Sequence, residues 1–461
     1  MSSPPSPPRS QASEAARVSA LLGLLFGLTG LGSASVAIVL PVMADDLGVS
    51  TGVSAWAISL YALMLAVATP LYGRVSDLVG IRLPLTIGVV MMSVGAVGGA
   101  LAPDFGLLLV ARILQGAGAA AIPTLGVAIL SARYVGAVKG RALGRLAGVA
   151  AAITSLGPLA GGGVEAGVGW RAVLALPVLG AFVLPVLWRR VPTTGTGASL
   201  DLVGAALVAT TAAGVVLLVQ SPSTGPVVAG IGAAMALLGA PAVAAWVRRR
   251  PDGFLPRDVI RNATVVRSSL AAAAIPAAWF ALLIVVPAVL VAEGWEPWQV
   301  GLVLLPSAVT GLLAPRLAGP LLARIGAGRT LAAATVGAAL SLTVASLGAE
   351  VHSSVLLAVA IVALTLAFGV GQPALMQGVG DAVAEDVRGV ALGIATLIFM
   401  VGAGLGAAVI GGLGELLGLA GAMLLLAALP LAGLVALVPE VRRQERAAEP
   451  VADALVDQPV D

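Results

Sequence analysis

The chain contains 461 residues, of which 59% are hydrophobic and only 10% are charged, and its mean hydropathy is +1.06. Soluble domains carry about 25% charged residues, so this composition excludes a soluble protein and indicates an integral membrane protein. The chain has no cysteine and a single histidine, His352, which excludes disulfide chemistry and a histidine-based metal site; neither a metal nor another cofactor is expected.

Apolar runs long enough to cross a bilayer recur along the chain, since a spanning helix needs about 20 such residues. The first run follows a proline-rich tail at residues 1–17, which we expect to be disordered, and it is too long for a signal peptide. A second tail occupies residues 441–461. The pattern predicts an all-α membrane protein with fourteen spans, at about 18–43, 52–72, 83–101, 105–131, 141–163, 170–188, 200–220, 226–247, 264–291, 298–318, 329–348, 353–377, 388–412 and 418–438.

The charges between these spans are segregated by sign. If both termini are cytoplasmic, all of the 25 Lys and Arg except Arg112 and Arg171 fall on the cytoplasmic side. The outer loops are acidic instead, with Asp45, Asp46, Asp104, Glu165, Glu293, Glu296, Glu350 and Glu415. This distribution obeys the positive-inside rule and supports an even number of spans, because one miscounted helix would invert every later loop. We expect a multi-pass protein of the plasma (bacterial inner) membrane.

The fourth predicted span, 105–131, contains a charge, Arg112. A cation at the centre of a bilayer costs at least about 2.5 to 3.5 kcal/mol, so it normally faces a cavity or a partner. Gln115 follows one helical turn later, and small residues at 116–120 allow a neighbouring helix to come close. Arg112 either ties helices together through backbone carbonyls or forms a polar part of a transport pathway. We favour the second interpretation, with Gln115 beside it.

Two cytoplasmic turns have glycines at the same spacing, at residues 73–80 and 319–326. Two similar halves around a central cavity are the architecture of many secondary transporters. The sequence therefore predicts a six-helix bundle at 18–190, two inserted transmembrane helices at 191–250, and a second six-helix bundle at 251–440.

The residues at 73–82, 112–118 and 157–162 resemble three signature motifs of the major facilitator superfamily, in order and in position. The Gly-Pro motif at 157–162 is typical of the drug/proton antiporters of that family, and the inserted pair resembles their fourteen-helix branch. Residues 111–123, 132–134 and 140–144 are similar to the tetracycline exporters of Gram-positive bacteria. The resemblance implies the major-facilitator fold and export of small molecules coupled to protons.

The first and third motifs are expected to act in the conformational change. The first contains Gly73, Asp77, Gly80 and Arg82, and Asp77 either pairs with a neighbouring arginine in one conformation or is an ordinary solvated carboxylate. The third contains Gly157, Pro158, Gly161 and Gly162. These residues predict a kinked helix with a flat face that packs closely against the span at 298–318. Generic helix packing is the alternative for this motif.

The sequence departs from the family in its acids. Proton-coupled relatives place an acid in the first helix and another just before the helix-5 Gly-Pro, but here the first helix is uncharged and Thr154 lies before Pro158. All 22 Asp and Glu fall in predicted loops or tails. The candidates for proton coupling are therefore Asp77, Glu165 and Glu415, and the identity of the carrier is left open.

The missing interior carboxylate also bears on the cargo. A lipophilic cation would lack a buried counter-charge, so we expect a neutral, zwitterionic or anionic substrate. Thr154, Arg112 and Gln115 are assigned to the pathway. Possible substrate contacts are Phe26, Tyr61, Trp279, Phe280, Gln372 and Phe399. For any single one of the aromatic residues, packing or lipid contact is the alternative that we favour.

Together these features predict a monomeric exporter of an amphipathic small molecule such as an antibiotic, working by proton antiport and alternating access. Export of an endogenous metabolite or lipid is the nearest alternative, and a non-transporting membrane receptor is a more distant one. No convergent nucleophile or phosphate-binding loop is present, so we expect no enzyme. The expected partners are the small molecule, protons and the bilayer, and no nucleic acid.

Overall fold

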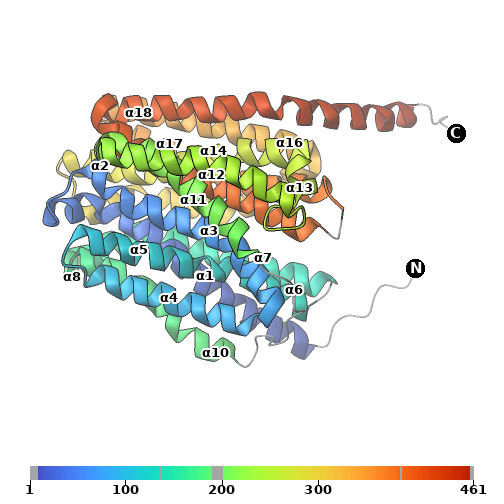
Figure 1. The fold of residues 1–461 in the computed structure, drawn as a ribbon, viewed down its shortest axis with the longest axis horizontal. Helices are drawn as coiled ribbons and strands as arrows, with labels where there is room; N and C mark the ends of the chain where they lie inside the picture. Colours follow the sequence, from blue (N-terminus) through green and yellow to red (C-terminus); the bar gives the residue numbers. More distant parts are fainter. Residues whose placement is uncertain (1–8, 135, 189–200, 385–386, 457–461) are drawn as a thin grey trace.

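A computed structural model describes residues 9–134, 136–188, 201–384 and 387–456, and their regular elements are all helical. Figure 1 shows two groups of long helices lying side by side, with the described chain beginning and ending at the same end. The N-terminal half comprises α1 (Arg9–Asp46), α2 (Thr51–Ser54), α3 (Trp56–Val79), α4 (Arg82–Ala100), α5 (Phe105–Ala119), α6 (Ala121–Arg133), α7 (Gly136–Ser155), α8 (Gly157–Val168), α9 (Trp170–Ala175), η1 (Leu176–Phe182) and α10 (Leu184–Trp188).

The rest of the described chain forms an inserted pair and a C-terminal half. The pair comprises α11 (Leu202–Gln220), η2 (Ser221–Ser223) and α12 (Pro226–Arg249). The C-terminal half comprises α13 (Arg257–Arg261), α14 (Ala263–Ala292), α15 (Pro297–Val303), α16 (Leu305–Glu350), α17 (Ser354–Asp381) and α18 (Arg388–Val456).

Among the described residues, 12 helices are long and apolar enough to cross a membrane, or 13 if α15 and the first part of α16, which meet at a 40° bend, form one span. Two glycines interrupt the longest helices. The backbone leaves helical geometry at Gly326 in α16 (φ 76°, ψ 168°) and at Gly418 in α18 (φ 70°, ψ 162°). Positive φ is accessible to glycine without steric cost, so each glycine lets the chain turn between two apolar segments.

Both chain ends differ from the prediction. The N-terminal tail was expected to be disordered through residue 17, but α1 begins at Arg9, and an ion pair of 2.7 Å between Glu14 and Arg133 fixes this extension to α6. The C-terminal tail was expected to begin at residue 441, but α18 continues to Val456. The segment after Glu440 is rich in Ala, Glu and Arg, which have high helix propensity.

The two halves contact each other chiefly through α1 with α14, α3 with α18, α7 with α16, and α8 with α15, and also through α2 with α18 and α1 with α15. One apolar cluster lies within the N-terminal half, around Leu22 and Leu125. A larger cluster includes residues of both halves, among them Ile38 and Ile284. Burial of apolar side chains therefore joins the halves as well as stabilising each one.

One helix of the inserted pair, α11, packs against both halves. Helix α11 contacts α12, α3 and α18. At its end, Gln220 is fully buried, and a Cβ on Gly412 of α18 would lie 2.7 Å from the Gln220 Cα. The last turn of α11 thus lies where α3 of one half meets α18 of the other.

Asp201 fastens the start of α11 to the chain that follows α12. Its carboxylate accepts hydrogen bonds from the Gly204 N–H (2.9 Å), the Phe254 N–H (2.8 Å) and the Trp246 indole N–H (3.0 Å). Partial burial alone would raise the pKa of Asp201, but these donors and the nearby Arg250 outweigh it, so the pKa lies below the ordinary value of 3.8.

Replacing Asp201 with Asn should therefore lower stability in a pH-dependent way. A depressed pKa adds stability above the unfolded-state pKa, and this is lost as the pH falls through the folded-state pKa. Because Asp201 is partly solvated, we expect a loss of only about 1 kcal/mol at neutral pH. Melting curves of detergent-purified Asp201→Asn and wild-type protein should differ at neutral pH and converge below the ordinary value of 3.8. An equal difference at both pH values would contradict the assignment.

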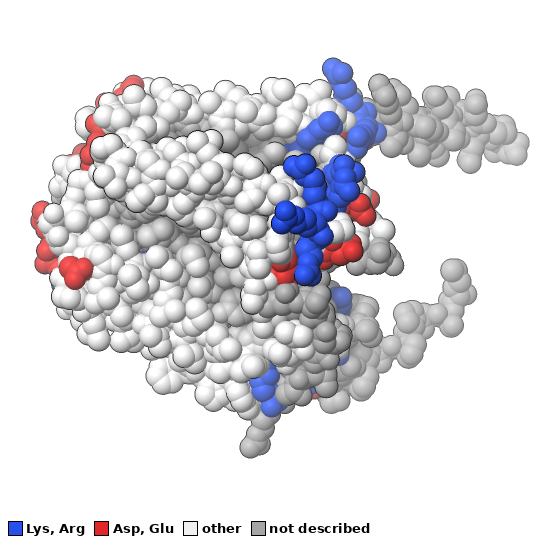
Figure 2. Space-filling model, viewed as in Figure 1, with Lys and Arg blue, Asp and Glu red and all other residues white. Residues whose placement is uncertain are grey.

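The charges gather at the two ends of the molecule, as Figure 2 shows. The end that carries the acids predicted for the outer loops, including Asp46, Glu293 and Glu350, is called the acidic end. The end that carries the arginines at 248–250, 257 and 261 is called the basic end. On the face shown, uncharged residues cover the region between them, as expected for helices in contact with lipid.

Candidate transport site

Arg112 lies on α5 with its side chain fully buried inside the N-terminal half. Its Nε donates to the Ala57 carbonyl of α3 at 2.8 Å, and its Nη1 donates to Oε1 of Gln115 at 2.6 Å. Its guanidinium carbon lies 4.2 Å from the ring centre of Tyr61, within cation–π range. Its Nη2 has no hydrogen-bond partner among the described residues. Dipoles and an aromatic face therefore hold this charge, and one donor group stays uncommitted.

Small residues around Arg112 bring its neighbours within reach. A Cβ on Gly95 of α4 would lie 2.6 Å from the Gln115 N, and a Cβ on Gly116 would collide with the Tyr61 backbone. Only glycine therefore permits this approach of α3 and α4 to α5. The glycines after Arg112 have the packing role that the sequence suggested.

Tyr61 connects this centre to α1. Its hydroxyl donates to the Thr29 carbonyl at 3.2 Å, while its ring lies against Arg112. Phe26, one helical turn earlier on α1, is half-buried against the N-terminal core. Of the predicted substrate contacts, Tyr61 is the one that touches Arg112, and Phe26 packs on a neighbouring stretch.

Thr154, assigned to the pathway from sequence, lies at the contact between α7 and α1. Its Oγ1 donates to the Gly27 carbonyl at 3.4 Å, and a Cβ on Gly30 would collide with its side chain. The residue is half-buried. The structure therefore places Thr154 against the first helix rather than beside Arg112.

The Gly-Pro motif breaks its span as expected, because α7 ends at Ser155 and α8 begins at Gly157. The Gly157 carbonyl accepts a hydrogen bond from Ser35 Oγ at 2.8 Å, and a Cβ on Gly161 would lie 2.8 Å from the Ser35 carbonyl oxygen. These glycines set α8 directly on α1. Pro158 is buried in the first turn of α8, where a missing N–H costs no helical hydrogen bond.

The same motif makes a close contact between the two halves. A Cβ on Gly162 would lie 2.6 Å from both the Pro297 carbonyl oxygen and the Trp298 Cα of α15. From the other side, a Cβ on Gly301 would lie 2.9 Å from the Pro158 carbonyl oxygen. Helices α8 and α15 therefore touch backbone to backbone at the acidic end. The sequence predicted that the motif would pack against the span at 298–318, and Trp298 and Gly301 belong to that span.

The turn at 73–82 is only partly described. Gly80 has φ 83° and ψ 169°, and its N–H bonds to the Ser76 carbonyl. This conformation is essentially restricted to glycine, which explains why position 80 is a glycine. The Arg82 guanidinium lies 5.3 Å from the centre of the Trp188 ring. The Asp77 side chain lies outside the described residues, so its conformation-dependent ion pair stays a prediction.

In the C-terminal half, the predicted contact residues form part of an aromatic cluster. The Trp279 ring lies 5.2 Å from Phe280 and 5.5 Å from Phe368, and Phe368 lies 5.4 Å from Phe399. The Trp279 indole N–H donates to Thr365 Oγ1 at 3.3 Å. Phe368 was missed from the sequence, although it follows Thr365 by one turn on an apolar helix. Phe280 and Phe399 are buried within the core.

Gln372 and two acids considered for proton coupling, Glu165 and Glu415, lie on other helices than Arg112. Gln372 is half-buried on α17. Glu165 is half-buried on α8, and Glu296 of α15 acts on it electrostatically. Glu415 is exposed on α18, and a Cβ on Gly52 of α2 would lie 2.8 Å from its Oε1. Both acids are therefore near the contact between the halves at the acidic end.

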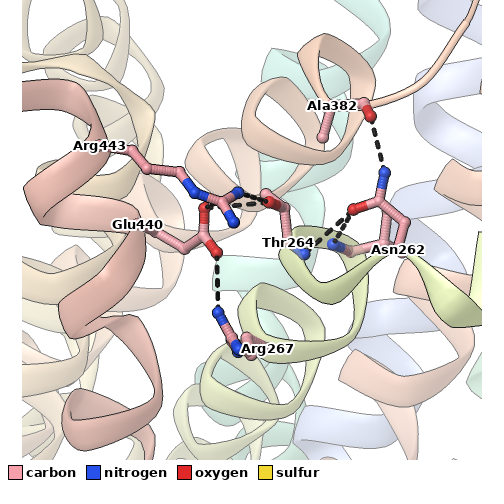
Figure 3. Close-up of polar contacts among 7 residues, drawn as sticks. Asn262, Thr264, Arg267, Ala382, Glu440 and Arg443 are labelled. Atoms are coloured by element: carbon pink, nitrogen blue, oxygen red, sulfur yellow. Dashed lines mark hydrogen bonds and ion pairs between the residues drawn. The ribbon is translucent and has the colours of Figure 1, made fainter. Parts of the chain in front are cut away.

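Several carboxylates that were expected in loops or tails lie on helices, and one of them, Glu440, is also buried. Glu440 on α18 is 7% exposed. Figure 3 shows its carboxylate between α14 and α18, where Oε2 accepts from Thr264 Oγ1 at 3.0 Å and Oε1 lies 3.8 Å from Arg267 Nη1. Glu440 was expected outside the membrane spans because the last apolar run stops at about 438. The helix continues past that run, and its inward face keeps Glu440 buried.

Two helical halves, apolar spans throughout and a buried guanidinium in one half define a multi-pass membrane transporter. The family model described as Major Facilitator Superfamily matches residues 22–257 and 268–457. The chain belongs to this superfamily.

Similar curated proteins carry names of efflux and drug resistance. The chain is 30% identical to multidrug resistance protein Stp of Mycobacterium tuberculosis over 305 residues, covering 63% of this chain and 56% of that protein. It is 33% identical to puromycin resistance protein pur8 of Streptomyces alboniger over 188 residues, covering 39% and 37%. It is 30% identical to efflux pump dotC of Dothistroma septosporum over 172 residues, covering 37% and 30%. The matched part thus spans less than two thirds of each relative.

Solved structures agree on the fold. A crystal structure of a POT family transporter in complex with 5-aminolevulinic acid superposes with a TM-score of 0.69 at 13% identity, covering 94% of this chain and 96% of that one. A second POT family structure, in complex with a thioalcohol-conjugated peptide, also gives a TM-score of 0.69, at 14% identity, and covers 93% of this chain and 96% of that one.

Proposed function

We propose that the protein is a secondary active exporter that moves an amphipathic small molecule, such as an antibiotic, out of the cytoplasm in exchange for protons. We also propose that it belongs to the fourteen-helix drug/proton antiporter branch, with the tetracycline exporters as similar proteins. The two halves rock about a central cavity, so that the cargo site opens to one side at a time.

The observation that carries the proposal is the environment of Arg112. A fully buried guanidinium is retained here with carbonyl, amide and ring contacts and with one N–H group uncommitted. A purely structural role would be served at lower cost by a neutral residue. A polar cargo group that binds Nη2 accounts for the charge, and the names of the efflux and resistance relatives support the same reading.

Fourteen spans follow if the two longest helices are divided at their glycines. At 1.5 Å per residue, the 69 residues of α18 would extend roughly 100 Å, about three times the thickness of the hydrocarbon core. Division at Gly418 gives two spans, and the bent pair of α15 and the start of α16 gives one more. Both termini are then cytoplasmic, at the basic end, in the plasma membrane. We propose a monomer.

Proton coupling is assigned to Asp77, Glu165 or Glu415, and Glu165 has the most suggestive position. It lies on α8 one turn after Gly162, and Glu296 directly precedes Pro297 at the same contact. Like charges repel most when the two halves close at the acidic end. Protonation of Glu165 would remove this repulsion and favour closure after a proton enters from outside. The contacts of Arg112 are a carbonyl, an amide and an aromatic ring, and none of them is a carboxylate that could balance a cationic cargo. The expected cargo is therefore neutral, zwitterionic or anionic.

Everted membrane vesicles test the direction and the cargo class. Vesicles that contain the protein should take up one or more compounds of a drug panel, including puromycin and tetracycline, when respiration is energised. Vesicles with an empty vector provide the baseline. If no compound accumulates above that baseline, drug export is wrong and an endogenous metabolite becomes the cargo to examine.

A further inference from the structure

The last residue of the inserted helix α11, Gln220, has a fully buried side chain. A buried amide is costly unless both its donor and its acceptor are satisfied. In the orientation that satisfies both ends, its oxygen accepts from the Trp56 indole N–H at 3.0 Å and from the Trp56 backbone N–H at 3.2 Å. Its nitrogen donates to Ser59 Oγ at 3.2 Å. The amide therefore bonds the inserted helix to α3 of the N-terminal half.

These contacts close the start of α3. Trp56 is the first residue of that helix, and the first N–H groups of a helix have no intrahelical partner. Ala55, at the N-cap position, makes no side-chain cap, so Gln220 supplies the cap from a distant part of the chain. The next carbonyl, that of Ala57, accepts from Arg112 Nε. Gln220 thus caps the same turn that holds Arg112.

The other side of α11 is fixed to the C-terminal half. A Cβ on Gly412 of α18 would collide with the Val219 carbonyl oxygen of α11, so the two backbones touch. At the far end of α11, Asp201 accepts from the Phe254 N–H, in the chain that leads into the C-terminal half. Backbone contact at one end and a hydrogen-bonded carboxylate at the other hold α11 to the C-terminal half along its length.

The two halves also meet directly beside Gln220. A Cβ on Gly52 of α2 would lie 2.5 Å from the Gly411 carbonyl oxygen and 2.8 Å from Oε1 of Glu415, both on α18. Glu415 is one of the acids predicted for the outer loops, so this meeting point lies toward the acidic end. If that end opens, α2 and the start of α3 leave α18. Because α11 stays with α18, the Gln220 amide then leaves Trp56.

We propose that Gln220 is a latch between the halves: α11 keeps the acidic end closed by capping α3 and releases α3 when that end opens. The inference rests on the rocking motion in the proposed function. Opening breaks three hydrogen bonds of a buried amide, which favours the closed conformation. The inserted pair therefore sets the balance between the two conformations, and Gln220 is a positioning residue that need not touch the cargo.

The test measures how far the halves separate in the purified full-length protein in lipid nanodiscs. The chain has no native cysteine, so spin labels on Gly167→Cys and Glu350→Cys report the distance across the acidic end by electron–electron double resonance. Gln220→Leu keeps the approximate size of the side chain and removes its hydrogen bonds. We expect the ratio of long to short distances to rise by about fivefold or more. Ser221→Ala is the matched control, because that hydroxyl donates to the Leu218 carbonyl of its own helix.

The same distances for Gln220→Leu and for the control would overturn the latch. A lower melting temperature with unchanged distances would also overturn it, because Gln220 would then be a packing residue. Gly162→Ala, measured with the same labels, separates this failure from that of the proposed function. If Gly162→Ala changes the distances and Gln220→Leu does not, the halves rock without a latch; if neither changes them, the rocking motion fails as well.

A second variant addresses the same contact from the other side. Trp56→Phe removes the indole N–H and keeps an aromatic ring, so it should also favour the longer distance. Combined with Gln220→Leu, it should add less than its separate effect, because both substitutions remove one shared hydrogen bond. Effects that multiply fully in the double variant would show that the two residues act independently, which would contradict the latch.

Discussion

Replacing Arg112 with alanine is expected to abolish export while leaving the amount of protein in the membrane close to that of wild type. The substitution removes the donors to Ala57 and Gln115 and the uncommitted Nη2 group. The backbone of α5 keeps its contacts through the neighbouring glycines, so helix packing should survive. Transport in everted vesicles and quantitative immunoblotting measure the two quantities independently.

Two further variants separate pathway from packing. Arg112→Lys keeps the charge but loses the planar fork, and we expect export to fall by about tenfold or more. Arg171→Ala removes an exposed arginine that pairs with Asp46 at 2.8 Å at the acidic end, and export should persist. If abundance falls in parallel with activity for Arg112→Ala, Arg112 is a structural tie between helices and the pathway assignment is wrong.

Replacing Gly162 with alanine should open the acidic end and impair transport. Its new Cβ would lie 2.6 Å from backbone atoms of Pro297 and Trp298, which cannot move aside as a side-chain end could. Overpacking of this kind costs about 1 to 3 kcal/mol, enough to change the ratio of two conformations by roughly five- to 150-fold. The cost falls on the conformation in which α8 and α15 touch.

The chain has no native cysteine, so spin labels can be placed at will on either half. Cysteines at the exposed positions Gly167 and Glu350 report the separation of the halves at the acidic end by electron–electron double resonance. The Gly162→Ala protein should show more of the longer distance. Gly163→Ala is the matched control, because a Cβ at Gly163 meets nothing within 4 Å. Identical distance distributions for the two variants would show that the α8–α15 contact does not set the conformational balance.

Hydropathy locates most of the membrane helices because lipid contact demands continuous apolar runs. Every predicted run from 18–43 to 264–291 coincides with a membrane helix of the structure. The run at 353–377 coincides with α17, but α16 and α18 each join two predicted runs, since the glycines at 326 and 418 turn the chain without a break in the helix. Counting helices by length and hydropathy therefore gives too few spans in α16 and α18.

Arg112 was identifiable because a charge inside an apolar run is rare, and its partner Gln115 lies one turn away. Its second partner, the Ala57 carbonyl, carries no side-chain signal and depends on the approach of α3. Glu440 was missed for the opposite reason, because an acid just beyond the last apolar run looks like a tail residue. Its burial arises from Thr264, Arg267 and the start of α14, which are far away in the sequence and only come together in the folded protein.

The central claim is exchange of cargo for protons through a pathway that requires Arg112. Purified protein in liposomes with an acidic interior and a neutral exterior has a proton gradient as its only energy source. With a drug identified in the vesicle panel as cargo, wild-type liposomes should accumulate it, and nigericin or Arg112→Ala should reduce accumulation to that of protein-free liposomes. Accumulation that is unchanged by nigericin would contradict proton antiport, and accumulation that is unchanged in Arg112→Ala would contradict the pathway.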